Sequence, residues 1–193
     1  MTDDDAVETF YTDERWQNWL DRLEEEDLDP ENEDSARLLL NLQDDAAIAV
    51  VKILAALDDE RIDEDRAVEE IHTVRDIVLA DVAFDDEDKV MLIDGVQTSL
   101  VPVFYAAEEY VVGGVVEGDV TEFVRAAADA EAEDDLDAAL GYVVQAGTRI
   151  IDGEPLDIDV VEELEYGLVS EWVNGLDSLQ SAMSDPEVVE EDE

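Results

Sequence analysis

The balance of charge constrains this chain more than any other feature of its sequence. Aspartate and glutamate make up 58 of its 193 residues, against ten lysines and arginines, which gives a formal net charge of −48 at pH 7. The acidic residues are spread along the chain and alternate with apolar residues at helical spacing, unlike the polar blocks of a disordered acidic tail. With an apolar content of 46%, this pattern predicts a packed core beneath a surface of carboxylates.

A carboxylate surface of this density indicates the solvent in which the chain folds. In dilute buffer the charges repel one another strongly, whereas at 1 M salt the Debye length falls to about 3 Å and most of the repulsion is screened. Lysine is nearly absent, with Lys52 and Lys89 beside eight arginines. We interpret the composition as an adaptation to a cytosol of molar salt, with hydrated cations held loosely at the surface. The alternative is an acidic decoy for basic partners in an ordinary cell.

Length and composition together predict a single domain. A chain of this size buries enough apolar surface to fold without covalent staples, and it has no cysteine for disulfides, thiolate nucleophiles or cysteine-bound metals. We expect a disordered acidic N-terminus over residues 1–10, a helical bundle over 11–184 and an acidic tail over 185–193. No signal peptide and no charge-free apolar run of 18 residues are present, so we expect a cytoplasmic protein without membrane contact.

Apolar residues recur at the spacing of amphipathic helices along nearly the whole chain, and strand patterns are almost absent. We therefore expect an all-α, single-domain bundle of about six to seven helices. The stretch 44–59 is apolar nearly all round and is predicted to be the central element, and a kink or break is expected at Pro102. The predicted helices span about 13–26, 30–57, 64–81, 86–112, 119–132, 135–152 and 158–183.

A weak self-match at an offset near 72 residues is typical of two duplicated three-helix units. The offset places residues 67–71 on 139–143 and Gly95 on Gly167. Any two amphipathic hairpins share such spacing, so unrelated helices are the alternative. Glycine within a helix costs about 1 kcal/mol and usually has a packing reason. Duplication therefore predicts close helix crossings at both glycines.

Paired carboxylates are the motif most easily misread in a chain this acidic. All-α pyrophosphohydrolases hold Mg²⁺ with E-x-x-E and E-x-x-D pairs on facing helices, and the pairs Glu162 with Glu165 and Glu131 with Asp134 have that spacing. Such pairs arise often by chance at this acidic content, so we interpret both as solvated helix faces. A phosphate substrate would also require basic residues, which are scarce. A divalent-metal hydrolase is kept as an alternative function.

The single histidine limits the remaining catalytic chemistry. Glu69 and His72 form one E-x-x-H motif, but a di-iron bundle needs two such motifs and further glutamates. No nucleophile elbow, EF-hand loop or glycine-rich phosphate loop occurs in the sequence. We interpret His72 as a partly exposed residue of its helix. The sequence therefore identifies no catalytic, cofactor-binding or metal-binding residue, and no cofactor.

Two clusters of side chains are candidates for contact with a macromolecule. Acidic residues interrupt the first, basic cluster, which favours intramolecular ion pairs over nucleic-acid binding. It comprises Lys52, Arg61, Arg66, His72 and Arg75. The second, aromatic cluster favours core packing over partner docking. It comprises Phe10, Tyr11, Trp16 and Trp19. No nucleic-acid partner is expected.

The segment 11–45 resembles the opening of a conserved archaeal protein family of unknown function that is common in haloarchaea; it reads YTDERWQNWLDRLEEEDLDPENEDSARLLLNLQDD. The resemblance supports a high-salt cytosol and implies no activity, cofactor or catalytic residue. We expect an uncharacterised, non-enzymatic helical interaction or regulatory protein that binds a protein partner or itself. The alternatives are the metal hydrolase above and an acidic mimic of nucleic acid, which requires rows of carboxylates on one face.

Overall fold

The computed structural model describes residues 9–29 and 31–184, and within these ranges it contains eight α-helices and no strand. The expected all-α class is confirmed, with one helix more than predicted. The acidic ends over 1–8 and 185–193, and Pro30, lie outside the described residues. The helices are α1 (Asp13–Glu25), α2 (Glu33–Asp58), α3 (Glu64–Val78), α4 (Glu87–Gly113), α5 (Val120–Ala132), α6 (Leu136–Ile151), α7 (Ile158–Glu163) and α8 (Leu168–Met183).

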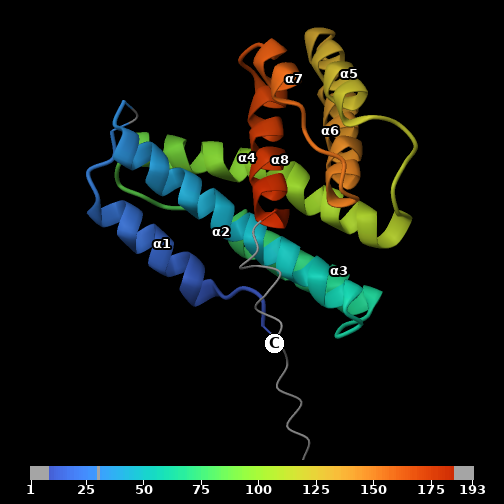
Figure 1. The fold of residues 1–193 in the computed structure, drawn as a ribbon. Coiled ribbons are helices and arrows are strands. Elements are labelled where there is room, and N and C mark those ends of the chain that lie inside the picture. The colour runs from blue at the N-terminus through green and yellow to red at the C-terminus, as the bar shows by residue number, and fades with distance from the viewer. Residues whose placement is uncertain (1–8, 30, 185–193) are drawn as a thin grey trace, which may run out of the picture.

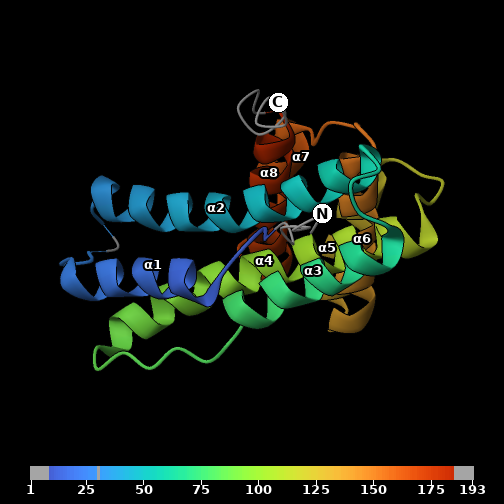
Figure 2. The same cartoon turned by 90° about the horizontal axis from the view of Figure 1, so that it is seen from below.

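The helices form two groups that cross. Helices α1 to α4 run roughly along one direction, and α5, α6 and α8 stand across them (Figure 1). After a rotation of 90°, α2, α3 and α4 still extend across the view while α6 and α8 are seen nearly end-on (Figure 2). The centre lies where α4 packs against α2, α3, α6 and α8. Residues 44–59 of α2 are largely buried, as predicted, and α2 packs against α3, α4 and α8, but α4 shares the centre of the fold with it.

Two glycines allow α4 to be crossed at short distance. A Cβ atom added to Gly175 of α8 would lie 1.7 Å from the Ser99 carbonyl oxygen, and one added to Gly147 of α6 would lie 2.5 Å from Ala106 Cβ. Neither glycine is one of the pair that the duplication hypothesis required. Gly95 has no atom within 4 Å of an added Cβ, so no helix crosses closely there. The predicted pair of glycine crossings is wrong.

The last predicted helix, over residues 158–183, is interrupted. Helix α7 ends at Glu163 and α8 begins at Leu168. Glu131 of α5 accepts hydrogen bonds from the backbone N–H groups of Leu168 at 2.7 Å and Val169 at 3.4 Å. The first N–H groups of a helix have no partner within it, and Gly167 at the N-cap has no side chain to serve them. A carboxylate from another helix therefore defines where α8 starts.

Pro102 does not break α4, contrary to one expectation. The helix continues from Glu87 to Gly113 with the proline inside it. Proline removes one helical hydrogen bond, but Pro102 and the following Val103 and Phe104 are buried, so tertiary packing holds the helix together. By length and composition α4 is also apolar enough to cross a membrane, and half of its most apolar stretch is buried inside the fold.

A buried polar contact joins α2, α4 and α8. Ser99 Oγ donates to Gln43 Oε1 at 2.7 Å, and Gln43 Nε2 donates to Ser178 Oγ at 2.9 Å. All three side chains are buried. Buried polar groups are costly unless they are hydrogen-bonded, so this satisfied network favours one register of the three helices over others.

Scarce cationic and amide side chains also cap helix ends from a distance. Lys89 Nζ, near the start of α4, donates to the carbonyl oxygens of Glu24 and Glu26 at the end of α1, at 2.7 Å each. Gln97 Nε2 of α4 donates to the Val78 carbonyl at the end of α3 at 2.8 Å. These donors satisfy carbonyls that a helix leaves without partners, so α4 fixes the ends of two other helices.

Candidate functional site

An apolar groove runs between the C-terminal half of α4 and the N-terminal half of α6. It has a volume of about 430 Å³. Its lining combines apolar side chains with three carboxylates, which come from both helices. The lining residues are Tyr105, Glu108, Glu109, Val112, Asp137, Leu140, Gly141 and Val144. We call this surface the α4–α6 groove.

The spacing of the sequence places two apolar rows along the groove. Tyr105 and Val112 lie two turns apart on α4, and Leu140 and Val144 lie one turn apart on α6. Val112 is 72% exposed and Tyr105 is 43% exposed, which is unusual for side chains that stand beside a core. Leu136, one turn before Leu140, is also exposed. The two rows therefore present apolar surface that no described part of the chain covers.

The groove is open at its α6 wall. A Cβ atom added to Gly141 would meet no atom within 4 Å, so the backbone there faces free space. Carboxylates stand beside the apolar rows on both helices, with Glu109 on α4 and Asp137 on α6, and both are exposed. The resulting surface is an apolar strip with negative edges.

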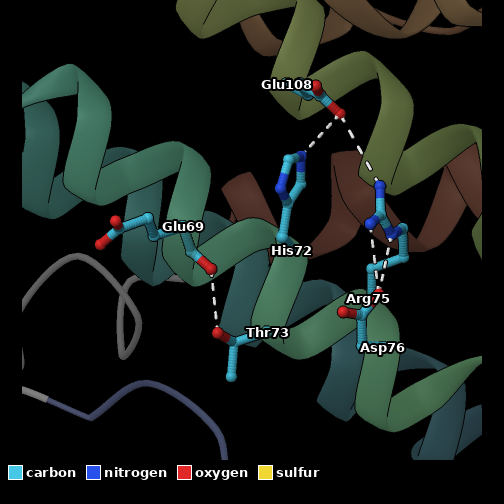
Figure 3. Close-up of polar contacts among 6 residues, drawn as sticks. All are labelled: Glu69, His72, Thr73, Arg75, Asp76 and Glu108. Carbon is cyan, nitrogen blue, oxygen red and sulfur yellow. Dashed lines mark hydrogen bonds and ion pairs between the residues drawn. The ribbon is translucent and has the colours of Figure 1, made fainter.

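Glu108 connects the groove to α3. Its Oε2 lies 3.1 Å from His72 Nε2 and 4.0 Å from Arg75 Nη1 (Figure 3). The His72 contact has the distance of an ion pair but not the direction of a hydrogen bond, so the buried Nε2 atom makes none. Arg75 also contacts Asp76 at 3.2 Å. The negative charge of Glu108 is therefore partly balanced from α3, whereas its neighbour Glu109 faces solvent.

The E-x-x-H motif does not form a ligand pair. Figure 3 shows the Glu69 carboxylate pointing away from His72, while Thr73 Oγ1 donates to the Glu69 carbonyl oxygen at 2.9 Å. The Glu69 carboxylate lies 3.8 Å from an Arg66 nitrogen instead. His72 is partly exposed, as predicted, and its contact with Glu108 is one that the sequence did not reveal.

The predicted ion pairs of the basic cluster are confirmed for four of its members. Each contacts a carboxylate of this chain, on its own helix, on a neighbouring helix or in an adjacent turn. The pairs are Arg61 with Asp59, Arg66 with Glu70 and Glu69, His72 with Glu108, and Arg75 with Asp76 and Glu108. The basic groups of this segment are thus paired with carboxylates of the chain, some of which are exposed at the surface.

The aromatic cluster packs into the core, as predicted. Tyr11 and Trp16 are buried and Trp19 is partly buried. Trp19 Nε1 donates to Asp45 Oδ2 at 3.0 Å, and Arg15 Nε donates to the same oxygen at 2.8 Å. Burial, and then the nearby Asp45 charge, raise the pKa of the Tyr11 hydroxyl above its ordinary value. These contacts attach α1 to α2.

Neither of the two carboxylate pairs singled out in the sequence lies in a cluster of described side chains that could bind a metal ion. Glu131 points to the start of α8, as described above, and its partner Asp134 is exposed beyond the end of α5. Glu162 and Glu165 are both exposed. Across residues 9–29 and 31–184, no three histidine or carboxylate side chains lie close enough together to hold a metal ion. The interpretation of Glu131 as a solvated face is corrected, because its carboxylate caps a helix.

The comparisons with known proteins identify the family of this chain but no activity. The family model described as "uncharacterized protein conserved in archaea (DUF2150)" matches residues 9–192. That match extends the resemblance of the segment 11–45 to nearly the whole chain. Neither the comparison with curated proteins nor the comparison with solved structures gave a match.

Proposed function

We propose that this protein, which belongs to that uncharacterised archaeal family, is a non-enzymatic interaction protein of a high-salt cytoplasm. Its α4–α6 groove binds an amphipathic segment of a partner protein, with apolar anchors in the groove and basic residues at its edges. The observation that carries this proposal is an apolar groove flanked by carboxylates, with the exposed Tyr105 and Val112 on one wall and the partly buried Leu140 and Val144 on the other.

The shape of the groove fits a helical segment. A helix lying between two others presents anchors at positions i, i+3 or i+4, and i+7, and the rows on α4 and α6 repeat at the same spacing. Burial of apolar surface is not screened by salt, whereas charge contacts at the surface are strongly screened at about 1 M salt. In such a solvent the apolar rows supply most of the affinity.

The charge around the groove favours a basic partner over a second copy of this chain. Glu109 and Asp137 flank the apolar strip, and the whole chain carries a net charge of −48. At the short distances of a docked interface, which are comparable to the Debye length of about 3 Å at 1 M salt, carboxylates of a second copy would repel those of the groove, whereas arginine or lysine beside the apolar anchors would pair with them. The carboxylates thus select the partner, and the apolar rows hold it.

A matched pair of substitutions on one helix tests the proposal. Val112→Asp places a charge in the groove, and Met91→Asp places one at an equally exposed position of α4 that does not line it; the two side chains are 72% and 71% exposed. The probe is a fluorescent synthetic helix with leucines on one face and arginines on the other, titrated in molar KCl. We expect Val112→Asp to weaken binding about tenfold or more and Met91→Asp to leave it unchanged.

Three results would overturn this proposal. The first is that a peptide of the same composition with scrambled leucine spacing binds equally well. The second is that both aspartate variants weaken binding alike. The third is that the peptide does not bind while sedimentation in molar KCl shows a dimer that Val112→Asp dissociates, because the groove would then serve self-association.

A further inference from the structure

A second cavity shares no lining residue with the α4–α6 groove, and we infer that it binds a small amphipathic organic cation. Its volume is about 540 Å³, within the range of about 300–1,000 Å³ typical of small-molecule sites. The lining comes from α2, α4, α6 and α8 and from the turn after α2. It consists of Val51, Leu54, Ala55, Asp58, Asp59, Arg61, Tyr110, Ile151 and Met183.

The floor of this cavity is apolar and belongs to the core. Val51 and Leu54 of α2 and Ile151 of α6 are buried, and Met183 of α8 packs against the same core. Tyr110 brings an aromatic ring from a side of α4 other than the one that carries Tyr105 and Val112. The cavity is therefore separate from the α4–α6 groove, and the inference does not depend on the proposed function.

Three helices end at this cavity with their C-termini. The last residues of α2, α6 and α8 are Asp58, Ile151 and Met183, and all three line it. The C-terminus of a helix carries roughly half a negative charge, since its last carbonyl groups have no partner in the helix. Three such ends around one cavity create a negative potential that favours a cation.

Side chains strengthen that potential. Asp58 and Asp59 stand at the rim, and Asp152 follows the end of α6. Burial, and then the charges of Asp58 and Asp152, raise the pKa of the Tyr110 hydroxyl, whose ring lines the cavity. Arg61 is the lining cation, and its guanidinium lies 3.8 Å from Asp59, so its charge is balanced at the rim.

The lining thus matches a ligand with an apolar body and one ammonium group. The apolar body lies against Val51, Leu54 and Ile151, and the ammonium group faces the carboxylates. The Tyr110 ring adds a surface that attracts cations. A hydrated metal ion lacks the apolar body, and an organic anion would meet the carboxylates and three helix C-termini.

Three probes of one chain length test the charge preference. Hexyltrimethylammonium, hexanol and hexanoate are titrated into the full chain by calorimetry, in the KCl concentration that keeps the chain folded. We expect the cation to bind most tightly, the alcohol more weakly and the anion not at all. Equal binding of the anion and the cation, or no binding of the cation up to millimolar concentration, would overturn the inference.

Substitutions then locate the site. Asp58→Asn is expected to weaken binding of the cation about two- to fivefold, whereas Asp94→Asn, at an exposed carboxylate of α4 outside both cavities, leaves it unchanged. Ala55→Phe fills the cavity and abolishes binding. If that variant does not fold, the comparison of the two asparagine variants decides alone, and equal effects of the two would place the cation elsewhere.

Discussion

Asp44 and Asp45 are adjacent carboxylates of α2 with opposite roles. Asp45 accepts hydrogen bonds from Arg15 and Trp19, so its charge is compensated. Asp44 is partly buried, and this burial raises its pKa, with the neighbouring Asp177 acting in the same direction and a hydrogen bond from Ser178 opposing it. Two residues with the same chemistry therefore differ because Asp45 has a cationic partner, whereas Asp44 is partly buried and has a second carboxylate nearby.

This difference predicts opposite effects of two asparagine substitutions. The folded chain holds the Asp44 proton more tightly than the unfolded chain does, so this carboxyl group stabilises the fold only at acidic pH. That contribution is lost as the pH rises from the ordinary value of 3.8 through the folded pKa. Asp44→Asn is therefore expected to raise the free energy of unfolding at pH 7 by up to about 1 kcal/mol, since partial exposure weakens the effect.

The free energies of unfolding of the wild type and the variant, measured with urea in molar KCl at pH 7 and pH 4, test this prediction. The gain from Asp44→Asn should shrink at pH 4, because a larger fraction of the wild-type carboxyl group is protonated there than at pH 7. Asp45→Asn serves as the control and should destabilise the fold at pH 7, because it removes the charge that Arg15 pairs with. Destabilisation of equal size by both variants would contradict this interpretation of Asp44.

At the scale of helices, the boundary between α7 and α8 depends on one side chain from α5. Glu131 serves the first N–H groups of α8, and an added Cβ at Gly167 would lie 2.5 Å from its carboxylate oxygen. Glycine at this position is therefore explained by the close approach of the carboxylate. The negative charge also lies at the positive end of the α8 dipole.

Removal of the Glu131 carboxylate tests whether it caps helix α8. Glu131→Ala is expected to cost about 0.5–2 kcal/mol of stability, as for other helix N-caps. Glu133→Ala, two residues away at an exposed position, is the matched control and should change the midpoint of thermal unfolding very little. Equal midpoints for the two variants would show that α8 does not need the carboxylate.

Local signals predicted most helix starts, and distant contacts decided what they missed. Helices α1 and α5 begin within one residue of their predicted starts, and Thr12 and Asp119 cap them, because an N-cap needs only nearby residues. The split of the last helix and the crossings at Gly147 and Gly175 depend on residues far along the chain. The periodicity of a helix does not reveal which glycine another backbone approaches.

The α4–α6 groove also depends on contacts between residues far apart in the sequence. The sequence places Tyr105 and Val112 on one predicted helix and Leu140 and Val144 on another, each pair at helical spacing. Whether a row is covered depends on the angle at which α6 crosses α4, which Gly147 permits and local spacing does not encode. Likewise, Glu108 and His72 stand on different helices, so their contact has no local signal.

At the scale of the whole molecule, basic side chains contact carboxylates and carbonyl groups of the chain mostly at or near its surface. Lys89 caps α1, Arg125 pairs with Glu163 at 3.1 Å, and Arg149 pairs with Glu154 at 2.8 Å. Ten basic residues cannot balance 58 acidic ones, so most carboxylates depend on ions of the solvent. The account therefore rests on one claim, namely that these carboxylates form a solvated coat over a helical core and are not part of a catalytic site.

The most direct measurement of this claim is the helical content of the purified chain as salt is removed. Circular dichroism is followed during stepwise dialysis from molar KCl into dilute buffer, with sucrose in place of KCl as a control for excluded volume. We predict that the chain unfolds as the Debye length grows and that KCl restores it better than sucrose does. A chain that keeps its helices and its unfolding midpoint in dilute buffer would contradict the account.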